Sequence, residues 1–374
     1  MSNDIERLFS LFIRMGLWRD GEVCVGQPLS ADEWAQLFRM AHSQGVTGLF
    51  IDGVAQGNVR PDNGLWDQWI AHLFCLEQAN RYIAKRGEAW IKRLGDAGIS
   101  ASVFKGSSVG VWYPEPLHRS HGDIDVVINN GWDRLESVLA QEACEPYRTD
   151  EDEIILEEQN GLLVEFHRRW EYLYNPWTNR RLQQWCRDAK PEDMELYLAC
   201  LILHIQRHFL TYGIGLKQVC DVAVMLRRAS LDRHRVAFLL RRLDAERFSR
   251  LLFGFISIHL GGVEDFPLSP IKAGKGLELL NDVILHEGYN LKMEQELVAG
   301  SKSWAMTRIV SNAAFWTQRC CRVCCIMPGE ACCFLLYKAM ERLKKLIKTK
   351  LNLLRRCILI IQQRNCWTIN GAGC

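Results

Sequence analysis

No stretch of this 374-residue chain approaches the roughly 18 to 20 consecutive apolar residues that a membrane-spanning helix needs. Apolar runs such as 196–203 and 331–337 are far too short. The first residues, Met1 to Arg7, lack the basic segment that opens a signal peptide. Internal repeats and low-complexity linkers are also absent. We therefore expect a folded globular protein in the cytoplasm, with association at the inner face of the membrane as an option that depends on its C-terminal region.

An excess of either charge is also lacking, because the formal net charge is only +2. This balance conceals a basic segment, residues 338–356, which holds eight Lys or Arg against the single acidic residue Glu341. Apolar residues recur there every three or four positions, which predicts a basic amphipathic helix over residues 336–361. Packing on the protein's own helices is the commoner role of such a helix, and peripheral contact with an anionic membrane is the alternative. Specific nucleic-acid binding is not expected, because no aromatic residues interleave with the charges.

Nine of the fifteen cysteines lie between residues 320 and 374. Cys321 and Cys324 have the spacing of one half of a zinc site, but Cys332 and Cys333 are adjacent and form no second Cys-x2-Cys pair. Reduced thiols, buried or facing lipid, are therefore favoured over a zinc site.

The hydrophobic periodicity divides the chain into four parts and indicates an α+β fold. Residues 1–95 have helical spacing, 96–190 alternate in the manner of strands, 191–319 are helical again, and 320–374 combine the cysteines with the basic helix. Ser30 and Glu33 have the form of a capping box at the start of a helix.

Residues 96–190 contain the predicted strands of a small mixed sheet. An alternating segment stops at Lys105-Gly106, which predicts a strand that enters a tight turn. Asn160-Gly161 is a dipeptide typical of hairpins. The predicted strands span residues 99–104, 123–128, 154–156 and 162–167.

Two carboxylates on one strand form the core of the candidate site. Asp123 and Asp125 project to the same side, because successive side chains on a strand alternate between faces. Glu165 adds a third carboxylate on a strand that we expect beside the first. Such a group needs a cation, and the usual choice is Mg²⁺, or Mn²⁺ in its place. Three carboxylates that hold metal ions are typical of phosphoryl or nucleotidyl transfer.

The turn before these aspartates has the residues to hold a triphosphate. Gly106 would allow a phosphate to approach the backbone, and the hydroxyls of Ser107 and Ser108 would donate to its oxygens. Lys105 and Arg119 are the nearest cations and would neutralise the charge on departing pyrophosphate.

Three histidines are further candidates for contact with the nucleotide or the acceptor. His167 shares a strand face with Glu165 and would lie at the acceptor end of the site. His204 and His208 share one face of a helix, as metal ligands do, but the glutamate of a zinc-protease motif is missing between them. Contact with the nucleotide, or a structural role in the helix, is the favoured interpretation for this pair.

These motifs resemble a known family. The segments Phe104-Lys105-Gly106, Arg119 to Val127, Val164 to His167 and Leu216 to Ala223 are similar to an uncharacterised bacterial nucleotidyltransferase family of the DNA polymerase β superfamily, over roughly residues 30–230. The resemblance implies a small mixed sheet with helices on one side. It also implies a glycine-serine turn at Gly106, a metal-binding pair at the aspartates and Glu165 as the third carboxylate. The interval from Gly106 to Asp123 is longer than is usual in the superfamily.

The implied activity is transfer of a nucleoside monophosphate from an NTP to a hydroxyl of a sugar, a peptide or another acceptor. The partners would then be an NTP and an unidentified acceptor, and residues 96–190 would be the catalytic domain. The alternative is a catalytically inactive nucleotide-binding or partner-binding protein of the same fold, recruited through its basic C-terminal helix.

Overall fold

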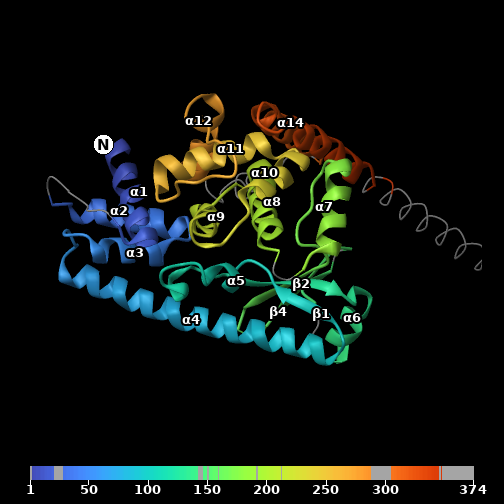
Figure 1. Ribbon diagram of the computed structural model, residues 1–374, viewed down its shortest axis with the longest axis horizontal. Helices are drawn as coiled ribbons and strands as arrows, with labels where there is room; N and C mark the ends of the chain where they lie inside the picture. The colour runs from blue at the N-terminus through green and yellow to red at the C-terminus, as the bar shows by residue number, and fades with distance from the viewer. Residues whose placement is uncertain are drawn as a thin grey trace, which may run out of the picture.

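The computed structural model describes residues 2–20, 28–141, 146–149, 151–158, 160–190, 193–211, 213–287, 305–344 and 347. Within these ranges the protein is a mixed α+β structure, in which a small sheet has helices before and after it in the chain (Figure 1). No helix in this part of the chain is long and apolar enough to cross a bilayer.

The N-terminal helices form a compact group that ends in one long helix. The capping box at Ser30 is confirmed, because Ser30 N–H donates to the Glu33 carboxylate at 2.8 Å and Glu33 N–H donates to Ser30 Oγ at 3.3 Å. The first and third helices pack closely, since a Cβ atom on Gly53 would lie 1.8 Å from the Phe12 carbonyl oxygen. The helices are α1 (Ser2–Trp18), α2 (Ala31–Ser43), α3 (Thr47–Gln56) and the 34-residue α4 (Asn63–Asp96).

The sheet follows α4 and has the strand order β1-β2-β5-β4-β3. Strands β2 and β5 are parallel neighbours, whereas the other pairs are antiparallel, so the predicted mixed sheet is confirmed. The predicted hairpin is also confirmed, since β4 and β5 pair on either side of Gly161. The strands are β1 (Ser100–Val103), β2 (Asp123–Asn130), β3 (Arg148–Thr149), β4 (Glu153–Glu157) and β5 (Leu163–His167), and the helical segments among them are α5 (Ser107–Gly110), η1 (Pro116–His118) and α6 (Trp132–Gln141).

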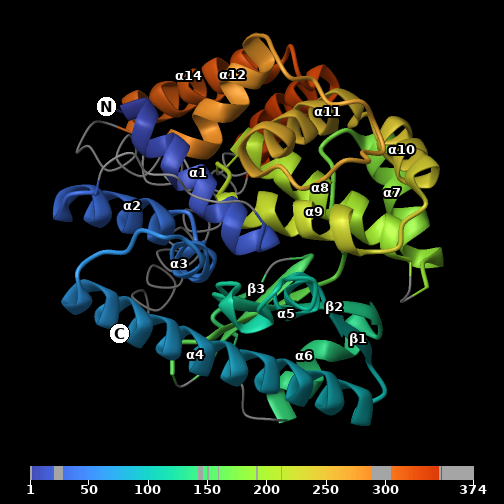
Figure 2. The same ribbon diagram turned by 60° about the vertical axis from the view of Figure 1, so that its left-hand side comes forward.

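One face of the sheet is covered by α4 and α6 and forms an apolar layer. Ile124 and Val126 of β2, with Phe166 of β5, are buried there against Trp90 of α4 and Leu135 of α6. The opposite face carries the aspartates and is turned toward α8 and α9 (Figures 1 and 2). The helices implied for one side of the sheet are thus α4 and α6, and a second helical layer lies beyond the other face.

The C-terminal helices share a hydrophobic core with the N-terminal group. Phe12 of α1 and Phe50 of α3 belong to the same buried cluster as Val222 of α9 and Phe255 of α11. The elements in this region are α7 (Pro176–Asp188), α8 (Met194–Thr211), α9 (Leu216–Arg228), α10 (Arg233–Arg242), α11 (Glu246–Phe255), the π-helical η2 (Ile256–Leu260), α12 (Lys275–Asp282), the π-helical η3 (Val283–Glu287) and α14 (Ala305–Val323).

The start of the predicted basic helix lies within helical residues 328–344. Phe334 anchors this helix in the core by ring contacts with Trp316 at 5.1 Å and Tyr174 at 4.8 Å. Beyond it, the described apolar side chains of the stripe are half or more exposed, so the body of the protein does not cover them, although Tyr337 still contacts the Tyr174 ring at 5.3 Å. These side chains are Leu336, Met340, Leu343 and Ile347. The remainder of the predicted helix, apart from Ile347, lies outside the described residues.

Candidate functional site

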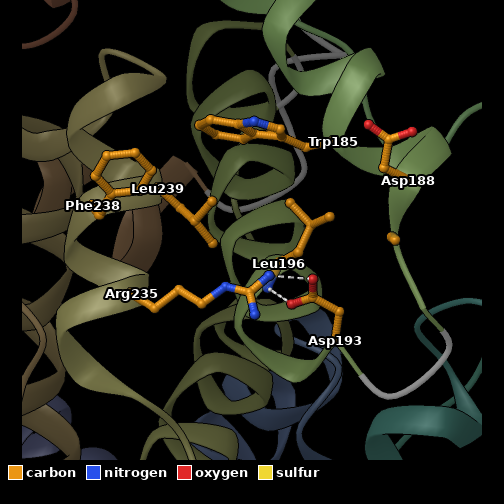
Figure 3. A pocket seen from close by; sticks show the side chains of 8 residues that line it. Trp185, Asp188, Asp193, Leu196, Arg235, Phe238 and Leu239 are labelled. Atoms are coloured by element: carbon orange, nitrogen blue, oxygen red, sulfur yellow. Dashed lines mark hydrogen bonds and ion pairs between the residues drawn. The ribbon is translucent and has the colours of Figure 1, made fainter.

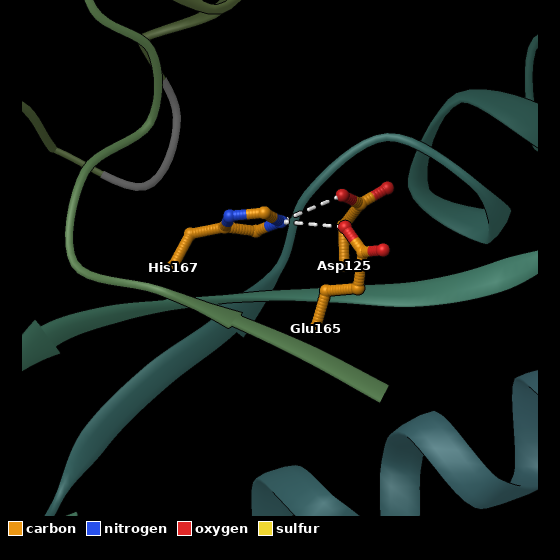
Figure 4. A group of neighbouring side chains, drawn as sticks. All are labelled: Asp125, Glu165 and His167. Carbon is orange, nitrogen blue, oxygen red and sulfur yellow. Dashed lines mark hydrogen bonds and ion pairs between the residues drawn. The ribbon is translucent and has the colours of Figure 1, made fainter. Parts of the chain in front are cut away.

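Strands β2 and β5 bring two of the predicted carboxylates together. Their parallel register pairs Asp125 with Glu165, so both side chains project from the same face of the sheet (Figure 4). Asp123 precedes Asp125 by two residues and has the same orientation, whereas Ile124 and Val126 enter the apolar layer. The predicted strand alternation is therefore confirmed.

Nitrogen atoms of two side chains contact Asp125. The Nε2 atom of His167 lies 2.9 Å from Asp125 Oδ1, and the Lys105 ammonium lies 3.4 Å from the same oxygen. His167 Nε2 is also 3.5 Å from Glu165 Oε2, so the imidazole bridges the two carboxylates (Figure 4). Burial would raise the pKa of Asp125, but Lys105 and then His167 outweigh burial and hold this pKa below its ordinary range.

The other two carboxylates are shifted in the opposite direction. Burial raises the pKa of Glu165 to about 7, and the negative charges of Asp125 and Asp123 contribute to the rise. Burial, followed by the charge of Asp125, also raises the pKa of Asp123. The site therefore contains one carboxylate that stays ionised beside two that ionise less readily, as expected where buried negative groups crowd together.

The chemistry of these side chains fits a divalent metal ion. Asp125, Glu165 and His167 each offer one ligand atom, and these three atoms lie within 4.8 Å of one another. A small divalent ion with ligands at about 2.1 Å spans about 4.2 Å between opposite ligands, which matches this group. Asp123, which the sequence placed in the metal-binding set, is not part of this group, and His167 supplies the third ligand atom instead.

The Lys105-Gly106 turn lies at the end of β1. Lys105 has φ of 62° and Gly106 has φ of 48° and ψ of −123°, a conformation that favours glycine. The Lys105 N–H donates to the Tyr197 hydroxyl at 2.9 Å, and Ser108 Oγ donates to the Lys105 carbonyl at 2.6 Å. Ser108 is therefore engaged in holding the turn together.

A cavity of about 540 Å³ lies over the carboxylates, between the sheet and helices α8 and α9. Most of the predicted site residues line it, but Ser107, Ser108 and His167 are not among its lining residues. The predicted residues that line it are Lys105, Gly106, Arg119, Asp123, Asp125, Glu165, His204 and His208, and the others are His121, Gly122, Arg148, Leu201, Ile205, Lys217, Gln218 and Asp221.

Arg119 lines the cavity but is held by Asp221 of α9. Its Nε donates to Asp221 Oδ1 and its Nη2 donates to Asp221 Oδ2, both at 2.7 Å. The Tyr113 hydroxyl donates to the same carboxylate at 2.7 Å. Burial would lower the pKa of Arg119, but Asp221 outweighs burial and raises it, so the guanidinium stays charged.

The two helical histidines lie on the cavity wall, with ring centroids 4.3 Å apart. His204 Nδ1 contacts the buried Glu171 carboxylate at 2.7 Å, and Arg207 Nε donates to the other oxygen of Glu171 at 2.6 Å. Burial, followed by the charge of Lys105, lowers the pKa of His204 to about 4. Burial also lowers the pKa of His208. Both rings are therefore neutral near pH 7, and neither belongs to a metal-competent group among the described residues.

Sequence reasoning assigned no role to four residues that shape this cavity. Asp221 and Glu171 anchor Arg119 and His204 from distant parts of the chain. His121 and Lys217 line the cavity directly. Lys217 and Asp221 belong to the segment that carried the family resemblance, and this was the available signal for them; nothing in the local sequence singled out Glu171.

A second, smaller cavity of about 290 Å³ lies away from the carboxylates (Figure 3). None of the predicted site residues lines it. An ion pair between Arg235 and Asp193 crosses one side, and the Trp185 ring lies on another.

The cysteine segment shows free thiols where it is described. Cys320 is buried and Cys321 is exposed, and neither Cys321 nor Cys324 joins a metal-competent group among the described residues.

Comparison with known proteins gives one match. A family model described as uncharacterised nucleotidyltransferase matches residues 30–261, more than half of the chain. This interval contains the whole sheet and both helices that face it across the cavity. No curated protein matches the chain, and no solved structure does.

Proposed function

We propose a specific activity for this chain, which belongs to the uncharacterised nucleotidyltransferase family: metal-dependent transfer of a nucleoside monophosphate from an NTP to an acceptor hydroxyl. In this reaction the acceptor oxygen forms a bond to the α-phosphorus as the bond to pyrophosphate breaks. The observation that carries the proposal is the paired register of Asp125 and Glu165 beneath a cavity large enough for a nucleotide.

We assign the metal site to Asp125 and Glu165, with Asp123 or His167 as the further ligand. The oxygen donors favour Mg²⁺ or Mn²⁺ among divalent ions. A bound ion of this kind would polarise a phosphoryl oxygen and neutralise developing negative charge. Lys105, whose ammonium lies 3.4 Å from Asp125, would then be available to turn toward the phosphates.

Glu165 has a second role in the proposal, because its pKa of about 7 suits proton transfer near neutral pH. As a carboxylate it would complete the metal site or accept the proton of the acceptor hydroxyl. His167 would orient it through the contact between Nε2 and the two carboxylates.

The triphosphate would lie along the turn after β1. The backbone of Gly106 allows close approach of a phosphate, and the Lys105 ammonium lies beside it. Ser107 and Ser108 would act through the backbone geometry of the turn. Arg119 would contribute positive charge from the cavity wall while it stays bonded to Asp221. His204 and His208 would contact the nucleotide or the acceptor as neutral rings.

The activity can be tested with labelled NTPs, Mg²⁺ and a cell extract as the source of acceptor. We expect label transfer by the wild-type protein and a loss of about 100-fold or more in Asp125→Asn, since even second-shell partners of a metal site are worth 10- to 100-fold. Glu157→Gln is the matched control, because Glu157 is an exposed carboxylate on the same sheet and should transfer label normally.

Two results would contradict the proposal. If wild type and Asp125→Asn transfer label equally, the aspartate is not part of the machinery. If the wild type binds NTP but transfers nothing to any extract, the inactive nucleotide-binding alternative is favoured.

We also propose that the basic helix contacts an anionic membrane surface. Its exposed stripe, Leu336, Met340, Leu343 and Ile347, lies beside Arg342 and Lys344, and the sequence adds further lysines and arginines up to residue 356. A second copy of this helix would bring like charges together, whereas anionic lipid complements them.

Flotation with vesicles of phosphatidylcholine and phosphatidylserine tests this contact. The wild type should float with the mixed vesicles, and the double variant that carries both Met340→Glu and Leu343→Glu should not. Tyr147→Glu, which alters an exposed aromatic residue far from the stripe in the sequence, is the control. Equal flotation of the wild type, the double variant and Tyr147→Glu would exclude this surface as the contact.

A further inference from the structure

The helical side of the cavity holds a lysine whose ammonium is not hydrogen-bonded to any of the residues that the structure describes. Lys217 is the second residue of α9 and lines the cavity together with the carboxylates of the sheet. Its aliphatic stem passes over the backbone of Gly45, since a Cβ atom there would lie 3.5 Å from Lys217 Cβ and Cδ. The side chain is thus directed by the packing of α9 against the loop after α2.

The other cations of the cavity are already paired. Arg119 is bonded through two nitrogens to Asp221, Lys105 lies 3.4 Å from Asp125, and Arg148 lies 3.5 Å from Glu153. The backbone N–H of Lys217 donates to the Gln44 carbonyl at 3.2 Å. Its ammonium, by contrast, makes no hydrogen bond and no ion pair within 4.0 Å with the described residues. Burial, followed by the charge of Arg119, lowers the pKa of Lys217, and the negative charges of Asp221, Asp123 and Asp125 offset this only in part. An ammonium that lines the cavity without a hydrogen-bonded carboxylate is therefore suited to an anionic ligand.

We propose that Lys217 binds the polyphosphate of the nucleoside triphosphate, a role that rests on the nucleotidyltransferase activity proposed above. The carboxylates and their metal ion would hold one side of the phosphate chain from the sheet, and the Lys217 ammonium would hold the other side from α9. A compact ammonium suits this task, because it offers three donors to oxygens of varied geometry.

The character of the cavity wall supports phosphate over the base as the partner of Lys217. No Phe, Tyr or Trp is among the residues that line this cavity in the described part of the chain, so a stacking platform for a base is lacking there. Asp221, the carboxylate nearest to Lys217 in the sequence among the cavity residues, already accepts hydrogen bonds from Arg119 and Tyr113.

Calorimetric binding of nucleotides in the presence of Mg²⁺ tests the assignment. The ribonucleotide series is chosen for the base that the wild type binds best, and the triphosphate, diphosphate and monophosphate are compared. Lys217→Gln should weaken triphosphate binding by about 10- to 100-fold, the range expected for a lost charged hydrogen bond, and should leave monophosphate binding within about twofold. Lys217→Arg should retain most of the affinity because it retains the charge.

Inorganic tripolyphosphate provides a second measurement without a base. The wild type should bind it and Lys217→Gln should bind it at least 10-fold more weakly. Lys275→Gln, an exposed lysine at the start of α12, is the matched control and should bind as the wild type does. Thermal unfolding of each variant verifies that it is folded, and Lys217→Met replaces the Gln variant if that one is not.

The outcomes separate the two proposals. If the wild type binds triphosphate and Lys217→Gln binds it equally well, the role of Lys217 is overturned while the proposed activity stands. An equal loss for the triphosphate and the monophosphate also overturns the polyphosphate assignment. If the wild type binds no nucleotide and no tripolyphosphate, the proposed activity and the role of Lys217 both fail.

Discussion

Arg119 and Asp221 lie 102 residues apart in the chain and form a buried ion pair through two parallel hydrogen bonds of 2.7 Å. Arg119 follows η1, in the segment that leads to the aspartates, and Asp221 lies on α9 of the C-terminal helices. Both residues are 4% exposed. This pair therefore fixes the two walls of the cavity relative to each other and has no freedom to follow a ligand.

Removal of one partner of this pair should strongly destabilise the protein. We expect Asp221→Asn to lower the free energy of unfolding by about 3–5 kcal/mol, because it leaves a buried guanidinium without a counter-charge. Urea denaturation measures the change. The exposed pair of Lys92 and Asp96 is the control, and Lys92→Met should cost less than about 1 kcal/mol. Equal costs at the two sites would contradict the assigned role of the buried pair.

The turn before α5 should not tolerate a side chain at Gly106. We expect Gly106→Ala to cost about 1–3 kcal/mol, because its φ of 48° with ψ of −123° strains any L-residue, and to weaken triphosphate binding. Gly95→Ala is the control, since Gly95 lies in the last turn of α4 with open space around it and should be neutral or slightly stabilising. Denaturant unfolding compares them, and a neutral Gly106→Ala would show that the turn is not strained.

Metal binding should depend on the proton of Glu165. Between pH 4.5 and about 7 the unfolded chain releases this proton while the folded protein retains it. The free energy of unfolding measured without added metal therefore falls as pH rises through this window. A metal ion replaces the proton, and we expect Mn²⁺ to raise the melting temperature more at pH 8 than at pH 5.5. Glu165→Gln should remove this difference. A metal shift in the wild type that is equal at both pH values would exclude the carboxylate as a ligand.

His121 should make the protein sensitive to acid. Burial, followed by the charge of Arg119, lowers the pKa of His121 to about 3, so below pH 6.5 the unfolded chain takes up a proton that the folded protein does not. Stability is therefore fully present above pH 6.5 and is lost as pH falls toward 3. In His121→Asn the slope of stability against pH near pH 5 should decrease by about 1.4 kcal/mol per pH unit, measured by urea denaturation. An unchanged slope would contradict this, and pH 8 is the reference at which no such difference arises.

The strands and the orientation of the carboxylates could be predicted because their signals are local. Alternation along β2 placed Asp123 and Asp125 on one face, and the Asn160-Gly161 dipeptide placed β5 after a hairpin. The two-residue strand β3 is too short to produce an alternating pattern. The position of β5 beside β2 was an expectation that the folded sheet confirms, whereas their parallel direction was not predicted.

The partners of the charged residues could not be predicted, because they come from distant segments. Sequence reasoning treated Arg119 as a free cation for pyrophosphate, while its guanidinium is bound by Asp221. It treated His204 and His208 as a pair, while Glu171 holds His204 from the segment after β5. Complementary burial on elements far apart in the chain decides such contacts, and no periodicity reports them.

The shared register of β2 and β5 has a consequence for how the chain can change in length. Side chains on a strand alternate, so a slip of one residue in β5 would turn Glu165 into the apolar layer beside Trp90 and bring Phe166 to the cavity. An insertion between α6 and β4 would leave both strands in register. Insertions or deletions in the loops around this site are thus compatible with the metal site, whereas a single added or deleted residue inside β5 would abolish it.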